Sequence, residues 1–138
     1  MTISLLILPD EFSLYQFSRD YRPSATWFDM PWYTISKTTA EVSVLCPTNA
    51  AASVAAEANK TERGWRCFQV DAQMDFGLVG ILASIVDPLR DNKIPVFVVS
   101  TYDTDYILVK EDTLEKAMGV LNKENNIVIK PGESVLLK

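Results

Sequence analysis

The second half of the chain carries hydrophobic patterns that predict a regular series of strands and helices. Residues 64–70, GWRCFQV, alternate between two faces as a half-buried strand does. Residues 78–92 place apolar side chains three or four positions apart, the spacing of a helix packed on a core. The same patterns predict strands at 94–100 and 106–110, a helix at 111–125, a strand at 126–130 and a further short strand within 131–138.

In chain order, residues 64–130 therefore read β-α-β-β-α-β. This is the order of the ferredoxin-like arrangement, in which two helices pack on a sheet. The expected fold class is α+β.

The first 62 residues resemble an incomplete copy of the same pattern. They predict two short strands, SLLIL and SLYQFS, a hairpin over 31–47 that turns at Thr38–Thr39–Ala40, and an alanine-rich helix at 49–62. The stretch between the second strand and the hairpin is short and contains Pro23, so a full first helix is not expected. We expect a truncated, degenerate unit at 1–62 that cannot bury a core alone, followed by a complete unit at 63–138.

The amino-acid composition excludes several classes of function and location. The formal net charge is −5, which disfavours binding to a phosphate backbone, so no nucleic-acid partner is expected. The sequence contains no histidine, the usual general base near neutral pH and the commonest metal ligand. No apolar stretch is long enough for a membrane helix, and no signal peptide begins the chain. Together with two isolated cysteines, Cys46 and Cys67, this predicts a cytoplasmic protein that binds no membrane.

The connection between the strands at 94–100 and 106–110 is unusually polar. It reads Ser-Thr-Tyr-Asp-Thr-Asp over residues 100–105, between two runs of aliphatic side chains. Such residues line small-molecule pockets, but they are also common in turns, where their side chains bond the backbone. Two carboxylates two positions apart also raise a magnesium hypothesis, for which only Asp75 and Glu111 are evident further ligands, so no metal is expected.

Several of these segments together resemble the ACT domain, in the tandem-ACT branch to which the arginine-sensing CASTOR proteins belong. The run from Ile94 to Lys110, with IPVF, STYDTD and ILVK in order, carries most of the resemblance, and EVSVLCP at 41–47 is similar to the strand that ends the first, degenerate unit of that branch. The resemblance covers roughly residues 30–125. It implies two tandem ferredoxin-like ACT units, the first of them truncated.

The resemblance also implies a regulatory module that binds a free amino acid at an interface between ACT units and is not an enzyme. An exposed sheet edge in either unit would be covered by the other unit or by dimerisation, so we expect a homodimer. We also expect a regulatory protein partner. The resemblance requires no cofactor. The site residues it implies lie at the start of the predicted helix and in the polar loop: Asp75, Phe76, Gly77, Leu78, Gly80, Ile81, Ser100, Thr101, Tyr102, Thr104 and Asp105. The arginine-sensing relatives carry an acid at the position of Leu78, which leaves arginine specificity in question.

The chemistry of these residues suits an amino-acid ligand. Backbone N–H groups at the start of a helix can hold a carboxylate, because they lack partners and lie at the positive end of the helix dipole. Asp105 can accept from an ammonium group, and the ring of Tyr102 can pack against the ligand. Two alternatives remain, a ligand-free protein-interaction module and, less favoured, a small enzyme.

Overall fold

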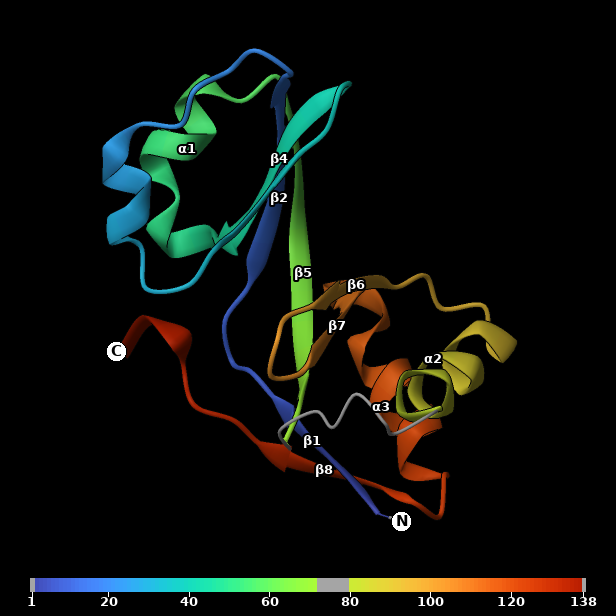
Figure 1. The fold of residues 1–138 in the computed structure, drawn as a ribbon. Helices are drawn as coiled ribbons and strands as arrows, with labels where there is room; N and C mark the ends of the chain where they lie inside the picture. Colours follow the sequence, from blue (N-terminus) through green and yellow to red (C-terminus); the bar gives the residue numbers. More distant parts are fainter. Residues whose placement is uncertain (1, 72–79, 138) are drawn as a thin grey trace. The chain divides into compact units, whose positions relative to one another are not determined.

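The computed structural model describes residues 2–71 and 80–137, and it divides the chain into two compact units (Figure 1). Unit 1 contains Met1–Pro9 and Arg66–Glu133, and unit 2 contains Asp10–Trp65 and Ser134–Lys138. The predicted division at residue 62 thus differs from the observed one, because the first nine residues group with the second half of the chain and the last five with the first half.

Unit 1 has the predicted β-α-β-β-α-β order, with one strand added from the N-terminus. Its elements are β1 (Ile3–Ile7), the second half of β5 (Lys60–Val70), α2 (Ile81–Asp91), β6 (Phe97–Ser100), β7 (Asp105–Lys110), the 3-10 turn η3 (Glu111–Thr113), α3 (Leu114–Asn122) and β8 (Ile127–Pro131).

The strands of unit 1 run in the order β6-β7-β5-β1-β8. The added strand β1 lies between the first and last strands of the ferredoxin-like order. Its residue Leu5 pairs with Val70 of β5 in an antiparallel ladder and with Ile129 of β8 in a parallel one. The predicted strand SLLIL therefore completes the sheet of the second unit, although it was expected in the first.

The core of unit 1 forms between one face of this sheet and the two helices. Alternate strand residues point to the same face of a sheet, and those of β1, β5 and β7 enter one cluster with residues of α2 and α3. The fully or nearly buried members include Leu5, Phe68, Val70, Ile107 and Val109 from the strands, and Ile85, Leu89, Ala117 and Leu121 from the helices. Both helices thus cover the same face.

Unit 2 repeats this order with a reduced first helix. Its elements are β2 (Phe12–Ser18), the 3-10 turn η1 (Ala25–Asp29), β3 (Thr34–Lys37), β4 (Glu41–Pro47), η2 (Thr48–Ala50), α1 (Ala52–Glu57), the first half of β5 and η4 (Val135–Leu137). The strand order is β3-β4-β2-β5. As predicted, no full helix stands between the first two strands of this unit, and the hairpin turns at Thr38–Ala40.

The expectation that the first half of the chain lacks a core of its own is wrong. Tyr15, Phe17, Trp27 and Val44 belong to a separate cluster of buried residues in unit 2. The ring centroids of Phe17 and Trp27 lie 5.2 Å apart. The short η1 turn thus packs a large aromatic side chain on this core, where a complete unit would pack a helix.

Two further predictions of elements are corrected. The alanine-rich helix at 49–62 is limited to Ala52–Glu57, because Lys60 already pairs with Gln16 as part of β5. The strand expected within 131–138 is instead the η4 turn, which forms because the Asp10 carboxylate accepts from the Val135 N–H at 2.9 Å. Within the described parts of the chain, no helix is long and apolar enough to cross a membrane.

Candidate functional site

The predicted binding loop is the turn of the β6–β7 hairpin in unit 1. Ser100 is the last residue of β6 and Asp105 the first of β7, and the two are paired across the hairpin. Branched aliphatic residues on both strands favour extended pairing on either side of this turn. The sequence therefore predicted the position of this loop correctly. The one difference is that β7 begins at Asp105, one residue before the predicted start of that strand.

The turn is held by its own threonines. The Thr101 N–H donates to the Thr104 carbonyl at 2.9 Å, and the Thr101 hydroxyl donates to the same oxygen at 3.2 Å. The Thr104 N–H in turn donates to Thr101 Oγ1 at 3.3 Å. These bonds are those of the turn-forming alternative raised from the sequence.

Thr104 also joins the hairpin to the end of β5. Its side chain is buried, and its hydroxyl donates to the carbonyl of Val70 at 2.7 Å. Val70 is the last residue of β5, so the loop is held beside the point where the chain leaves this strand for α2. This tie was not evident from the sequence.

Asp105 is the buried charged residue of the loop. Only 3 % of its surface is exposed, and its Oδ1 atom accepts from the Ser100 hydroxyl at 2.5 Å. A carboxylate held away from water is costly unless it is hydrogen-bonded, and this bond satisfies part of that requirement. Ser100 therefore orients the carboxylate that the sequence predicted as an ammonium acceptor.

Tyr102 lies at the tip of the hairpin and is 77 % exposed, so its ring is open to solvent on most sides. Gly80 caps the start of α2 with a φ of +87°, a conformation that side chains with a Cβ rarely adopt, and Ile81 is the first residue of that helix. No side chain among the described residues caps this helix start. Asp75, Phe76, Gly77 and Leu78 lie outside the described residues, so the predicted approach of the helix start to the loop stays a prediction.

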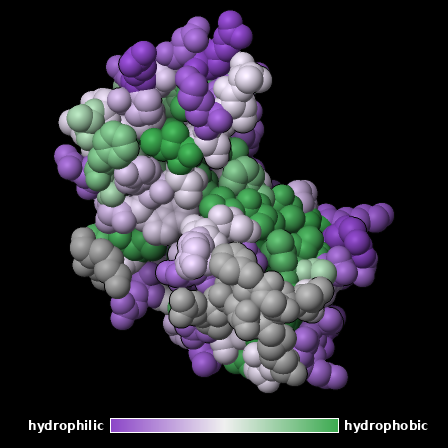
Figure 2. All heavy atoms as spheres, viewed as in Figure 1, coloured by the Kyte–Doolittle hydropathy of each residue, from purple (hydrophilic) through white to green (hydrophobic). Residues whose placement is uncertain are grey.

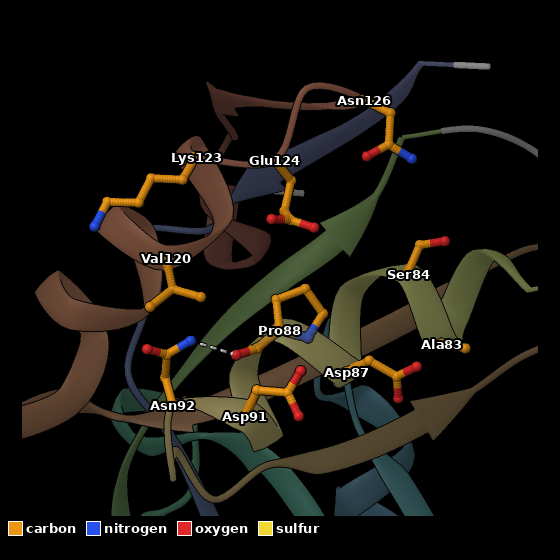
Figure 3. Close-up of a pocket in the computed structure, with 10 residues that line it drawn as sticks. All are labelled: Ala83, Ser84, Asp87, Pro88, Asp91, Asn92, Val120, Lys123, Glu124 and Asn126. Atoms are coloured by element: carbon orange, nitrogen blue, oxygen red, sulfur yellow. Dashed lines mark hydrogen bonds between the residues drawn. The ribbon is translucent and has the colours of Figure 1, made fainter.

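A separate surface pocket of about 510 Å³ lies in unit 1 between α2 and the end of α3 (Figure 3). Pro88 lies at its centre, and Lys123 extends away from it. Its acidic residues on α2, Asp87 and Asp91, are largely exposed, and both contact Arg90 at 3.1–3.3 Å. Solvent screens such exposed ion pairs, so they contribute little to stability. None of the predicted site residues lines this pocket.

The thiols are poorly suited to nucleophilic chemistry. Burial raises the pKa of Cys46 to about 12 and raises that of Cys67 as well, so neither thiol ionises near neutral pH. In the residues that the structure describes, no group of three or more His, Cys, Asp or Glu side chains could hold a metal ion.

The βαββαβ order of unit 1, the reduced copy in unit 2 and the polar hairpin together define a tandem ferredoxin-like α+β protein. Residues 60–123, from the start of β5 to the end of α3, match the family model of the ACT domain. This segment of the chain is therefore similar to the ACT domain, as the sequence predicted.

Comparisons with individual proteins agree with this assignment. The human protein CASTOR3P is 40 % identical over 52 residues, a match that spans 38 % of this chain and 32 % of that relative, so the chain covers about a third of its length. The crystal structure of Atu0741 from Agobacterium tumefaciens has a TM-score of 0.80 and 27 % identity, covering 96 % of this chain and 97 % of the other.

The fold is also that of aspartate kinase regulatory domains. The ligand-free regulatory subunit of aspartate kinase from Thermus thermophilus has a TM-score of 0.56 at 6 % identity, covering 86 % of this chain and 95 % of that one. At this identity the likeness shows the fold alone.

Proposed function

We propose that this protein is a regulatory module that reversibly binds a free amino acid beside the β6–β7 hairpin. The observation that carries the proposal is the buried carboxylate of Asp105, oriented by the Ser100 hydroxyl on a hairpin tied to the end of β5. A carboxylate already placed and partly desolvated can accept from an ammonium group without further ordering of the protein.

The remaining ligand contacts follow from the chemistry of an amino acid. The N-terminal N–H groups of α2, after Gly80, suit the ligand carboxylate, and Tyr102 offers an exposed aromatic face to the ligand side chain. Asp75, Phe76, Gly77 and Leu78 lie outside the described residues and stay ligand contacts predicted from the sequence. We propose a regulatory rather than a catalytic role by analogy of fold alone, since the same fold serves as a regulatory subunit of aspartate kinase.

One observation favours a protein contact as well. Among the described strands, β6 pairs with β7 alone. Residues 96–99, which include most of β6 and the residue before it, are aliphatic or aromatic, carry no charge and are half-buried. Apolar side chains gather over β6 on the face shown in Figure 2. An uncharged sheet edge of this kind can pair with a second copy across a two-fold axis, so we propose a homodimer through β6. A protein-interaction module without a ligand is the alternative function that this edge supports.

A thermal-shift panel of the twenty amino acids tests the binding proposal. A ligand present at about 100 times its Kd stabilises the folded state by roughly 2.7 kcal/mol, which raises the melting temperature by several degrees. We expect at least one amino acid to do so. If none of the twenty raises it, the interaction-module alternative is favoured.

Two variants then localise the site. Asp105→Asn keeps an oxygen acceptor for Ser100 but removes the charge, so it should abolish the shift. Tyr102→Ala removes an exposed ring and should weaken the shift with little change in the ligand-free melting temperature. Phe28→Ala in unit 2, where the ring is 62 % exposed, is the matched control and should leave the shift intact.

A further inference from the structure

The hairpins of the two units repeat one turn geometry. In unit 2 the Thr38 N–H donates to the Glu41 carbonyl at 2.9 Å, as the Thr101 N–H donates to the Thr104 carbonyl in unit 1. In each turn the first threonine also accepts, through its Oγ1, from the N–H three residues later, at 3.1 Å for Glu41 and 3.3 Å for Thr104. The β3–β4 turn is therefore the structural counterpart of the proposed binding loop.

The two units also correspond in how each hairpin is bonded to the end of the unit's first strand. In unit 1 a side chain of the hairpin, Thr104, donates to the backbone where β5 ends. In unit 2 the Lys37 ammonium group donates to the carbonyl of Arg19, the residue after the end of β2, at 2.8 Å. In both units, therefore, the turn that joins the second and third strands is held next to the end of the first strand.

In unit 2 this place is an open pocket of about 520 Å³ lined by Arg19, Asp20, Lys37, Thr38 and Thr39. Two of these side chains are cationic and one is anionic, so the lining has a net charge of +1 in a chain whose net charge is −5. Arg19 is only loosely engaged, because its Nε lies 3.9 Å from Asp20 Oδ1 and the two side chains are 67 % and 88 % exposed. Its guanidinium group is accordingly available to a ligand.

We propose that this pocket is a second small-molecule site and that it takes small dicarboxylates, acidic amino acids among them. The guanidinium of Arg19 can bind one carboxylate through two parallel N–H bonds. The Lys37 ammonium group keeps two protons beyond the one given to the Arg19 carbonyl, and these can hold the second carboxylate.

The other residues that line the pocket indicate which of these ligands fits best. Thr38 Oγ1 already accepts from the N–H groups of Ala40 and Glu41, so its hydroxyl proton is left to donate outward. Asp20 can accept from an amino group, which an acidic amino acid carries and a plain dicarboxylate lacks. The ligand of charge −1 that matches this lining is an acidic amino acid. The proposal does not rest on the proposed function of unit 1, because it uses different residues.

The test is a backbone-amide NMR titration of the full chain with succinate and, separately, with L-glutamate, at ionic strength held constant with sodium chloride. We expect saturable shifts at the amides of Arg19, Asp20, Lys37, Thr38 and Thr39 with both compounds. Glutamate should bind more tightly than succinate, and Asp20→Asn should remove that difference.

Charge-matched variants separate a built site from general attraction of anions. Arg19→Gln should weaken succinate binding about fivefold, the effect of losing one exposed ion pair, without disturbing a fold in which the side chain is largely solvated. Lys116→Gln removes an equal charge from the exposed surface of α3 and should leave the affinity unchanged.

Shifts that do not saturate, or an equal loss in Lys116→Gln, would overturn the proposal. Glutamate shifts confined to the β6–β7 hairpin would also overturn it, while leaving the amino-acid site of unit 1 standing.

Discussion

The tie between the β6–β7 hairpin and β5 can be tested by replacing Thr104 with valine. The two side chains have nearly the same shape and both branch at Cβ, so Thr104→Val removes one hydroxyl and little else. The lost bond is the 2.7 Å hydrogen bond from the Thr104 hydroxyl to the Val70 carbonyl.

The expected cost follows from the burial of both residues. A typical hydrogen bond contributes about 1 kcal/mol net, but a buried group left without its partner costs about 1–3 kcal/mol. Thr104 and Val70 are both buried, so water cannot readily replace the hydroxyl at that carbonyl. We therefore expect Thr104→Val to lower the free energy of unfolding by about 2 kcal/mol.

Urea unfolding followed by circular dichroism measures this change. With an m-value near 2 kcal/mol/M, the midpoint should fall by about 1 M while the m-value stays the same. The melting temperature should fall by roughly 6–8 °C. Thr61→Val is the matched control, since it makes the same chemical change at an exposed position of β5 and should alter stability by less than about 0.5 kcal/mol.

A Thr104→Val protein as stable as the parent would refute the reasoning, because the hydroxyl would then contribute nothing to holding the hairpin. The result bears on function too. If the tie positions Asp105 for a ligand, the variant should also lose affinity for any amino acid identified by the thermal-shift panel.

Other substitutions and conditions probe the two cores. Gly132→Ala should lower the free energy of unfolding by about 1–3 kcal/mol in urea, because the new Cβ would lie 2.9 Å from a leucine methyl carbon. Gly119→Ala in α3 has open space around the new Cβ and should raise the free energy of unfolding by about 0.4–1 kcal/mol. Trp27→Ala should cost about 3–5 kcal/mol and reduce amide-exchange protection first in unit 2. Burial raises the thiol pKa values of Cys46 and Cys67, so the folded state retains protons that the unfolded state loses above about pH 9. The free energy of unfolding should therefore fall as the pH rises from 9 to 11, and replacing both cysteines with alanine should flatten that fall.

The fold of residues 64–130 could be predicted because each element there carries a strong local signal. Helical spacing over α2 and α3, and apolar runs over β6 and β7, are properties of neighbouring residues and need no knowledge of the rest of the chain. The absence of a full first helix in unit 2 was predictable for the same reason, since Pro23 and a short connection leave no room for one.

The errors lie where distant contacts decide the conformation. Alanines favoured a helix through residue 62, but Lys60 pairs with Gln16 in a sheet, and tertiary pairing overrides helix propensity. The η4 turn depends on the carboxylate of Asp10, more than 120 residues earlier. The placement of β1 between β5 and β8 is likewise a choice among strands that no local pattern encodes.

For the loop, the sequence located the polar residues but not how they are used. The hydroxyls of Ser100, Thr101 and Thr104 donate to Asp105, to a turn carbonyl and to Val70, respectively. A hydroxyl has one proton to donate, so these three have none left for a ligand. The hydroxyls therefore hold the hairpin, and the loop contacts that we propose for the ligand are those of Asp105 and Tyr102.

This division of roles predicts how Ser100→Ala should behave. The substitution leaves the Asp105 charge in place but removes the bond that orients it, so binding should weaken and remain detectable, whereas Asp105→Asn should abolish it. Calorimetric titration of both variants with the stabilising amino acid distinguishes the two cases. Equal and complete loss in both would mean that Ser100 itself contacts the ligand, and the hydroxyl would then have to leave Asp105 when the ligand binds.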